Sequence, residues 1–193
     1  MGKWIVGITG ASGSVYSLRL MEELLKKGHE VHLVATCNGR KVTEYETGRN
    51  FEEILQFHGR REGRLEVHDV EDLFAPIASG SFKTDGMVVI PCSMSTLGEI
   101  AAGASKNLLG RAADVMLKEK RKLVLVPRET PLSTLHLRNM LSLSEMGVVI
   151  LPAMPGFYHR PEQVGDLVDF VAGRVLESLG IENDLYKKWG SMT

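Results

Sequence analysis

Short apolar runs alternate along this chain with segments whose apolar residues recur at helical spacing. Runs without polar alternation are typical of strands that are buried on both faces, as in a parallel sheet. Strands are expected at residues 3–8, 30–35, 65–68, 86–91, 122–127 and 147–151. Helices are expected at residues 14–27, 38–47, 97–102, 107–121, 133–146 and 161–179, the last opened by Pro161 in its first turn. The alternation predicts an α/β fold with a Rossmann-like, doubly wound parallel sheet.

No internal repeat or linker divides the chain, so residues 1–180 are expected to form a single domain, followed by a polar tail over residues 181–193. The 193 residues carry a net charge of −1 and no polybasic tract, which disfavours nucleic acid and anionic membranes as partners. No apolar run is long enough to span a bilayer, and no signal peptide is evident, so the expected location is the cytoplasm.

A glycine-rich turn lies between the first expected strand and the first expected helix. It contains Gly7, Gly10 and Gly13, with hydroxyls at Ser12 and Ser14. Glycines let the backbone approach a ligand, and a helix N-terminus offers free N–H groups to an anion. The turn therefore favours a phosphate site over a tight turn without a ligand.

The end of the second expected strand argues against a dinucleotide. A dinucleotide-binding fold usually places an acidic residue there for the ribose, but this chain has Thr36, Cys37 and Asn38. A mononucleotide fits better. Ligands of open α/β sheets bind beyond the carboxyl ends of the strands. The residues expected there are Gly10, Ala11, Ser12, Thr36, Ser93, Met94, Ser95, Thr96, Arg128, Glu129, Thr130, Phe157 and Tyr158.

Arg111 and Lys118 are seven residues apart on one expected helix, with Asp114 between them. The spacing alone favours a solvated ladder of ion pairs. The alternative is a cationic clamp for a second anion, completed by Arg128 and Arg174.

The spacing of the carboxylates and histidines in the sequence does not assign them to a catalytic or metal site. Glu129 is as compatible with a plain surface position as with a catalytic one, and Glu46 reads as a helix-surface residue. The histidines show no metal-ligand spacing, and Cys37 and Cys92 form no CxxC pair, so no metal site is expected. The residues themselves indicate a mononucleotide site and leave a second phosphate site open.

Several blocks together resemble the UbiX family of flavin prenyltransferases, within a wider group of flavin-binding, cysteine-decarboxylase-like (HFCD) folds. The blocks are GITGASGSVYSLRL, ASGSFKTDGMVVIPCSMSTLGEIAAG, NLLGRAADVMLKEKRKLVLVPRETPL and PAMPGFYHRPEQVGDLVDFVAGRVL. They span the chain from Gly7 to about Leu179. The glycine turn is weakly specific, whereas RAADVMLKE, PRETP and PGFY in this order are strongly so.

The resemblance implies that the chain joins a dimethylallyl group from dimethylallyl monophosphate to N5 and C6 of reduced FMN, without a metal. The prenylated FMN would then serve UbiD-type decarboxylases. FMN contacts are implied for Gly10, Ala11, Ser12, Thr36, Ser93, Met94, Ser95, Thr96 and Arg128. Thr36 replaces the more usual Ser, and Cys37, Asn38 and Gly39 replace the more usual Lys-Ala-Ala.

For the prenyl phosphate, the resemblance implies a clamp of Arg111, Lys118, Arg128, Tyr158 and Arg174. Glu129 resembles the acid that protonates the departing phosphate, and Glu46 and Ser12 resemble proton-handling groups near the flavin. Trp189 resembles a tryptophan that folds over the site, so the tail is expected at a subunit interface of a homododecamer.

Two alternatives stay open from the sequence. One is direct FMN-dependent decarboxylation, but the PxMNxxMW-type segment and the helix-borne histidine of such relatives are missing. The other is a flavin carrier subunit without catalytic activity, which would give the cationic cluster no role.

Overall fold

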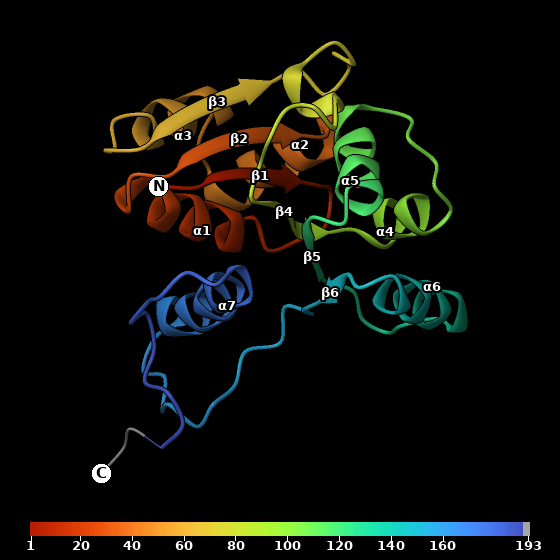
Figure 1. Ribbon diagram of the computed structural model, residues 1–193. Coiled ribbons are helices and arrows are strands. Elements are labelled where there is room, and N and C mark those ends of the chain that lie inside the picture. The colour runs from red at the N-terminus through yellow and green to blue at the C-terminus, as the bar shows by residue number, and fades with distance from the viewer. Residues whose placement is uncertain (191–193) are drawn as a thin grey trace.

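The structure is a computed structural model that describes residues 1–190. Strands and helices alternate along the chain (Figure 1), and six parallel strands form one sheet in the order β3-β2-β1-β4-β5-β6. The strands are β1 (Lys3–Ile8), β2 (Glu30–Ala35), β3 (Arg64–His68), β4 (Gly86–Cys92), β5 (Lys122–Pro127) and β6 (Val149–Ile150). The predicted doubly wound Rossmann-like sheet is confirmed.

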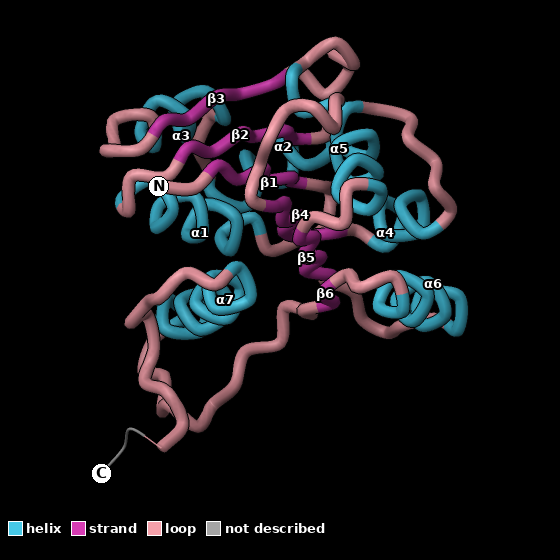
Figure 2. The backbone as a smooth tube through the Cα atoms, viewed as in Figure 1, coloured by secondary structure: helices cyan, strands magenta, loops and turns pink. Residues whose placement is uncertain are grey.

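Helices cover both faces of the sheet (Figure 2). They are α1 (Ser14–Lys26), α2 (Cys37–Thr47), α3 (Phe51–His58), α4 (Met94–Ala101), α5 (Leu108–Lys118), α6 (Thr134–Glu145) and α7 (Val164–Leu179), with a short 3-10 helix η1 (Pro76–Ala78). One core cluster joins the sheet to α1, α3 and α7, and the other joins it to α4, α5 and α6. The four inner strands β2, β1, β4 and β5 are buried on both sides because each face has its own apolar core, whereas the edge strands β3 and β6 are partly exposed.

The helices differ most from the prediction at α3, α4 and α7. Helix α3 was missed inside a stretch that lacks clear periodicity, although Asn50 accepts a hydrogen bond from the Glu52 N–H as its N-cap. Helix α4 begins at Met94 rather than at residue 97, because Ser93 caps it. The prediction that Pro161 opens α7 is wrong, because the helix begins three residues later, at Val164.

The carboxylate of Asp166 sets the start of α7, because it accepts hydrogen bonds from the N–H groups of Glu162 (2.8 Å) and Gln163 (3.1 Å). These bonds hold the chain around Gln163 outside the helix. The first helical residue is therefore Val164 rather than Pro161.

The segment after α7 folds back against the loop that precedes this helix (Figure 1). Tyr186 is 8% exposed and packs on Phe170 of α7, with the ring centroids 4.8 Å apart. The Tyr186 hydroxyl donates to Glu177 at 2.9 Å. No helix within residues 1–190 has the length and apolar character needed to cross a bilayer.

Candidate active site

The order of strands places the site-forming turns at one edge. Strand β1 pairs in parallel with β2 on one side and β4 on the other, so the loops after all three strands leave the sheet at the same edge. The chain crosses from β3 at the sheet edge to β4 beside β1, which makes the β1–β4 boundary the point where the strand order reverses. Open α/β sheets bind their ligands in the crevice at such a point.

Thr9 joins the two turns at this point. Its hydroxyl is fully buried, donates to the Pro91 carbonyl at 2.7 Å and accepts from the Ser93 N–H at 2.7 Å. The end of β1 and the start of α4 are therefore held together by one side chain. Thr9 was not among the residues predicted for the site, although its position next to the glycine turn was an available signal.

Ser93 and Thr96 shape the N-terminus of α4. The Ser93 hydroxyl accepts from the Thr96 N–H at 3.3 Å and lies 3.0 Å from the Thr96 hydroxyl. Met94 and Ser95, between them, line a surface pocket together with residues of α6. Hydroxyl groups and the first N–H groups of a helix are donors that suit a phosphate.

The glycine turn holds an anion of the protein itself. The Glu46 carboxylate accepts hydrogen bonds from the N–H groups of Gly13 (3.0 and 3.1 Å) and Ser14 (2.8 Å). Burial opposes ionisation of Glu46, but the Ser12 hydroxyl and these N–H groups outweigh it and lower the pKa of the carboxyl. A carboxylate from α2 thus occupies the N–H groups at the first turn of α1, and the phosphate site expected at this turn stays a prediction.

Gly10 and Gly39 let α2 approach the glycine turn closely. A Cβ on Gly10 would lie 2.8 Å from the Asn38 Cβ, and one on Gly39 would lie 2.6 Å from the Ile8 carbonyl oxygen. The Thr36 hydroxyl caps α2 by accepting from the Gly39 N–H at 3.0 Å. The departure at residues 37–39 therefore places a glycine where this packing leaves no room for a side chain.

Arg128 connects the end of β5 to the glycine turn. Its Nε donates to the Ser12 carbonyl at 3.1 Å. The Tyr16 hydroxyl interacts electrostatically with both Arg128 and Glu46; burial raises its pKa, Arg128 lowers it and Glu46 raises it. Tyr16 is thus a second residue that sequence reasoning missed, and its place in the first turn of α1 was the signal.

Glu129 follows Arg128 and is exposed. Its carboxylate accepts from the N–H of Thr130 at 3.0 Å. This local bond holds the carboxylate at the carboxyl edge of β5, beside the loop that Arg128 ties to Ser12. The position is open to a ligand that binds in the crevice.

Tyr158 and Trp189 lie together, although they are far apart in the sequence. Their rings meet edge to face with centroids 5.4 Å apart, and the Trp189 side chain remains 77% exposed. Arg174 on α7 pairs with Glu177. These three predicted substrate residues come from the α7 side of the sheet.

Arg111 and Lys118 lie on α5, on the opposite face of the sheet from α7 (Figure 1). Arg111 pairs with Asp114 at 2.6 Å and donates to the Ala78 carbonyl at 3.0 Å. Lys118 pairs with its neighbour Glu119 at 2.6 Å rather than with Asp114. Within a single chain, the sheet therefore lies between the two halves of the predicted clamp.

The expectation that the chain has no cluster of metal-ligating side chains is wrong for the described residues. His32, Glu66 and His68 place ligand atoms within 4.8 Å of one another. Linear spacing missed this group because its members come from two neighbouring strands.

The comparisons with known proteins identify the fold and the family. A family model described as "Flavoprotein" matches residues 2–176. The structure resembles the dodecameric, FMN-dependent UbiX-like decarboxylase from Escherichia coli O157:H7, with a TM-score of 0.91, 48% identity and coverage of 97% of this chain and 98% of that one. A UbiX protein in complex with FMN and dimethylallyl pyrophosphate gives a TM-score of 0.92 at 39% identity, over 98% of this chain and 97% of that one. The fold and the family match define a flavoprotein.

Sequence relatives give the narrower family. The flavin prenyltransferase UbiX of Halalkalibacterium halodurans is 55% identical, over 98% of this chain and 94% of that protein. The UbiX of Pseudomonas aeruginosa is 47% identical, over 96% and 92%. The chain belongs to the UbiX family of flavin prenyltransferases. A phosphopantothenoylcysteine-type decarboxylase shares only the fold, with a TM-score of 0.60 at 20% identity over 83% of this chain and 85% of that one.

Proposed function

We propose that this protein joins a dimethylallyl group from dimethylallyl monophosphate to N5 and C6 of reduced FMN and so makes prenylated FMN. One observation carries the proposal: in a UbiX-family chain, Ser12 contacts both Glu46 and Arg128 at the carboxyl edge of the sheet. Ser93, which begins α4, is held at the same edge by its bond to Thr9. Reduced FMN supplies the electron-rich N5 and C6 that form the new carbon bonds. UbiD-type decarboxylases would receive the product.

The donor set at the crevice fits a flavin mononucleotide. Ser93, Ser95 and Thr96 offer hydroxyls at the N-terminus of α4, where a ribityl phosphate gains from the helix dipole. The glycine turn offers the close backbone approach that a flat ring needs, because Gly10 and Ala11 carry little or no side chain. Thr36 and Arg128 add polar contacts from the flanking strand ends.

The chain's own residues supply the remaining chemistry in this proposal. When the allylic C–O bond breaks, negative charge develops on the departing phosphate, and fixed cations stabilise it. Arg128 and Glu129 stand at the end of β5, where the arginine can neutralise the phosphate and the carboxyl can donate a proton to it. Tyr158 and Trp189 form an aromatic pair that can stabilise the allylic cation.

The rest of the clamp requires a second subunit. Arg111 and Lys118 lie on α5 while Arg174 lies on α7, so one chain cannot bring them around one phosphate. A homododecamer would place α5 of one subunit against the α7 side of another, with the tail at the contact. The structural relative from Escherichia coli is dodecameric, which supports this arrangement. The cytoplasmic location expected from the sequence stays a prediction.

The decisive experiment measures the mass of the flavin. Purified protein loaded with reduced FMN is incubated without oxygen with dimethylallyl monophosphate, and in parallel with the diphosphate. We expect the released flavin to be heavier by one prenyl unit with at least one donor. Flavin of unchanged mass from FMN-loaded, folded protein would reject the transferase proposal and favour the carrier subunit.

Direct decarboxylation is separated by a second reaction. The same protein is given an aromatic acid in place of the prenyl donor, and the release of carbon dioxide is measured. We expect none, because the family assignment is to flavin prenyltransferases.

A further inference from the structure

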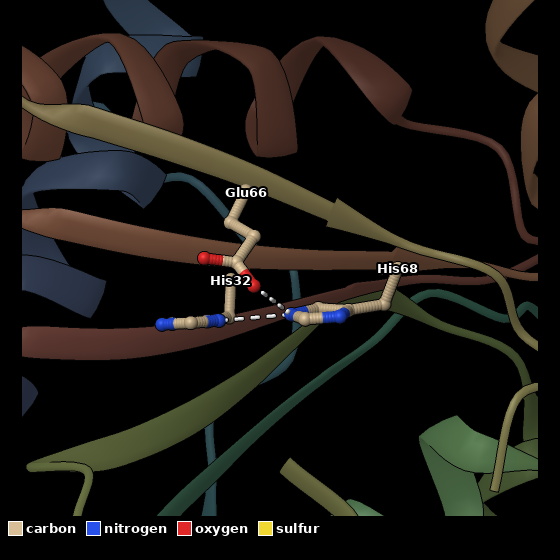
Figure 3. A group of neighbouring side chains, drawn as sticks. All are labelled: His32, Glu66 and His68. Carbon is tan, nitrogen blue, oxygen red and sulfur yellow. Dashed lines mark hydrogen bonds and ion pairs between the residues drawn. The ribbon is translucent and has the colours of Figure 1, made fainter. Parts of the chain in front are cut away.

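A group of three metal-ligating side chains lies outside the flavin site, on the two strands at one edge of the sheet. Strands β2 and β3 pair in parallel, and the register sets His32 opposite Glu66 and Val34 opposite His68. Side chains two residues apart on a strand share a face. His68 therefore lies on the same face as Glu66, next to His32 (Figure 3).

The ligand atoms of the three residues converge. The Nδ1 of His32 lies 2.8 Å from the Nε2 of His68, and that nitrogen lies 3.9 Å from the Oε1 of Glu66 (Figure 3). The rings of the two histidines lie within 10° of parallel. Two imidazole nitrogens and a carboxylate oxygen form the donor set of many three-ligand zinc sites.

An outer carboxylate fixes the His32 ring. The Nε2 of His32 donates to the Oε1 of Glu30 at 2.9 Å, and Glu30 in turn pairs with Lys3 at 3.2 Å. This bond places the proton of His32 on Nε2 and leaves the lone pair of Nδ1 facing His68 and Glu66. Histidine ligands in metal sites commonly donate their other ring N–H to a carboxylate in this way.

We propose that His32, Glu66 and His68 bind one zinc ion, with Glu30 as the outer partner of His32. The fourth coordination position would hold water. The two imidazole nitrogens have to separate from 2.8 Å to about 3.3 Å to accept bonds of about 2.0–2.1 Å at a tetrahedral angle. When zinc binds, the proton that His68 carries on Nε2 moves to its Nδ1. The residue stays neutral, and no proton is released or taken up there.

Burial and charge support this assignment. The side chains of His32 and His68 are 1% and 7% exposed, so both imidazoles are shielded from water. Glu66 would bring a negative charge to the ion through Oε1, while its Oε2 pairs with Arg64 at 3.0 Å. Zinc has an entry path, because Glu66 is partly exposed and His68 lines a surface pocket with Cys37 and Asp69.

The ion would tie the edge strand β3 to β2. Strand β3 has a pairing partner on one side only, so side-chain links to β2 matter more there than within the sheet. The role is structural and is independent of prenyl transfer.

The test uses the untagged, full-length protein, stripped with a chelator and dialysed against zinc ions. Metal analysis should find about one zinc per chain. A hundredfold excess of zinc over its dissociation constant should raise the melting temperature by roughly 5–10 °C. Cobalt in place of zinc should give the visible absorption of a tetrahedral ion.

Variants distinguish this site from adventitious binding. Glu66→Gln keeps the shape of a partly exposed side chain and should abolish the stoichiometric zinc, and His68→Gln should do the same. Glu30→Gln should weaken zinc affinity about 10–100-fold, as loss of an outer partner does. His136→Ala removes a potential ligand elsewhere and should leave one zinc per chain.

Two results would overturn the proposal. One is wild-type protein that takes up no stoichiometric zinc, in which case His32 and His68 form only a hydrogen bond between neutral rings. The other is equal uptake by wild type and by Glu66→Gln and His68→Gln variants that circular dichroism shows to be folded.

Discussion

The carboxylate of Glu46 accepts a hydrogen bond of 2.8 Å from the backbone N–H of Ser14, so that α2 supplies the negative charge at the N-terminus of α1. Because the same carboxylate also binds the Gly13 N–H, it fixes the glycine turn in the form that faces the crevice. Gly13 has a φ of 109°, a conformation that favours glycine. The turn is therefore held by a charge and not by packing alone.

Replacing Glu46 by Gln should loosen this turn. The neutral amide keeps one acceptor but loses the charge that favours bonds to N–H groups, and we expect a loss of about 0.5–1 kcal/mol because the side chain is exposed. Since the pKa of Glu46 is lowered in the folded protein, its contribution is present above the pKa of an unfolded glutamate and is lost as the pH falls through the folded value. Urea unfolding at pH 7 and pH 4 measures both effects, and a variant with an unchanged pH profile would contradict them.

Glu129→Gln should leave FMN bound and slow prenyl transfer, by about 10²-fold if Glu129 donates a proton to the departing phosphate. Flavin absorbance reports the first quantity and single-turnover mass measurements the second. Glu145→Gln, at the end of α6, is the matched control and should transfer at the wild-type rate. An unaffected rate in Glu129→Gln would assign the proton to another group.

Lys118→Ala should weaken binding of the prenyl phosphate by roughly tenfold or more while FMN affinity stays within about twofold, because a lost charge contact to phosphate costs on the order of 1.5–3 kcal/mol. Titration of each ligand into the assembled protein measures this. Lys27→Ala, at the C-terminal end of α1 away from the glycine turn, is the control. Equal losses for both ligands would return Lys118 to a surface ion pair with Glu119.

The two cysteines should differ sharply toward thiol reagents. Burial raises the pKa of the Cys92 thiol to about 12, and Cys37 is exposed. Because the thiolate is the reactive form, one thiol per chain should react in the folded, flavin-free protein and two after unfolding. Cys37→Ser should remove the fast reaction, and any fast reaction left in that variant would show that Cys92 is accessible.

His58 should make the protein sensitive to mild acid. Its side chain is 5% exposed, and burial lowers its pKa, so between the folded and unfolded values the unfolded chain binds more protons. This contribution to stability is present above the unfolded pKa of about 6.5 and is lost as the pH falls below it. His58→Gln should flatten the fall of the urea midpoint between pH 7 and pH 5; an equally steep fall would place the effect on other histidines.

Much of the fold could be predicted because its strands are apolar throughout and its turns carry glycine. Strand positions 3–8, 30–35 and 122–127 match the structure to the residue. The short helix α3 escaped because its start depends on the cap at Asn50 rather than on a long apolar period. Pro161 misled because the Asp166 carboxylate, not the proline, sets the first turn of α7.

Site residues could be predicted where the end of a strand alone places them. They could not be predicted where they depend on contacts with segments that are distant in the sequence. Parallel strands bring Ser12, Ser93 and Arg128 to one edge, and this follows from the pattern alone. The bonds from Glu46 to the glycine turn and the convergence of His32 with His68 need tertiary contacts that spacing does not contain. Arg111 and Arg174 lie on opposite faces, so their joint role depends on how subunits pack.

The seating of Tyr186 on Phe170 limits how this protein can be shortened or fused. A truncated form that stops at Gly180 would strip an aromatic ring and its hydroxyl bond from α7 and leave an apolar surface exposed to aggregation. A purification handle at this end therefore belongs after Thr193, on a spacer that leaves the Tyr158–Trp189 contact undisturbed.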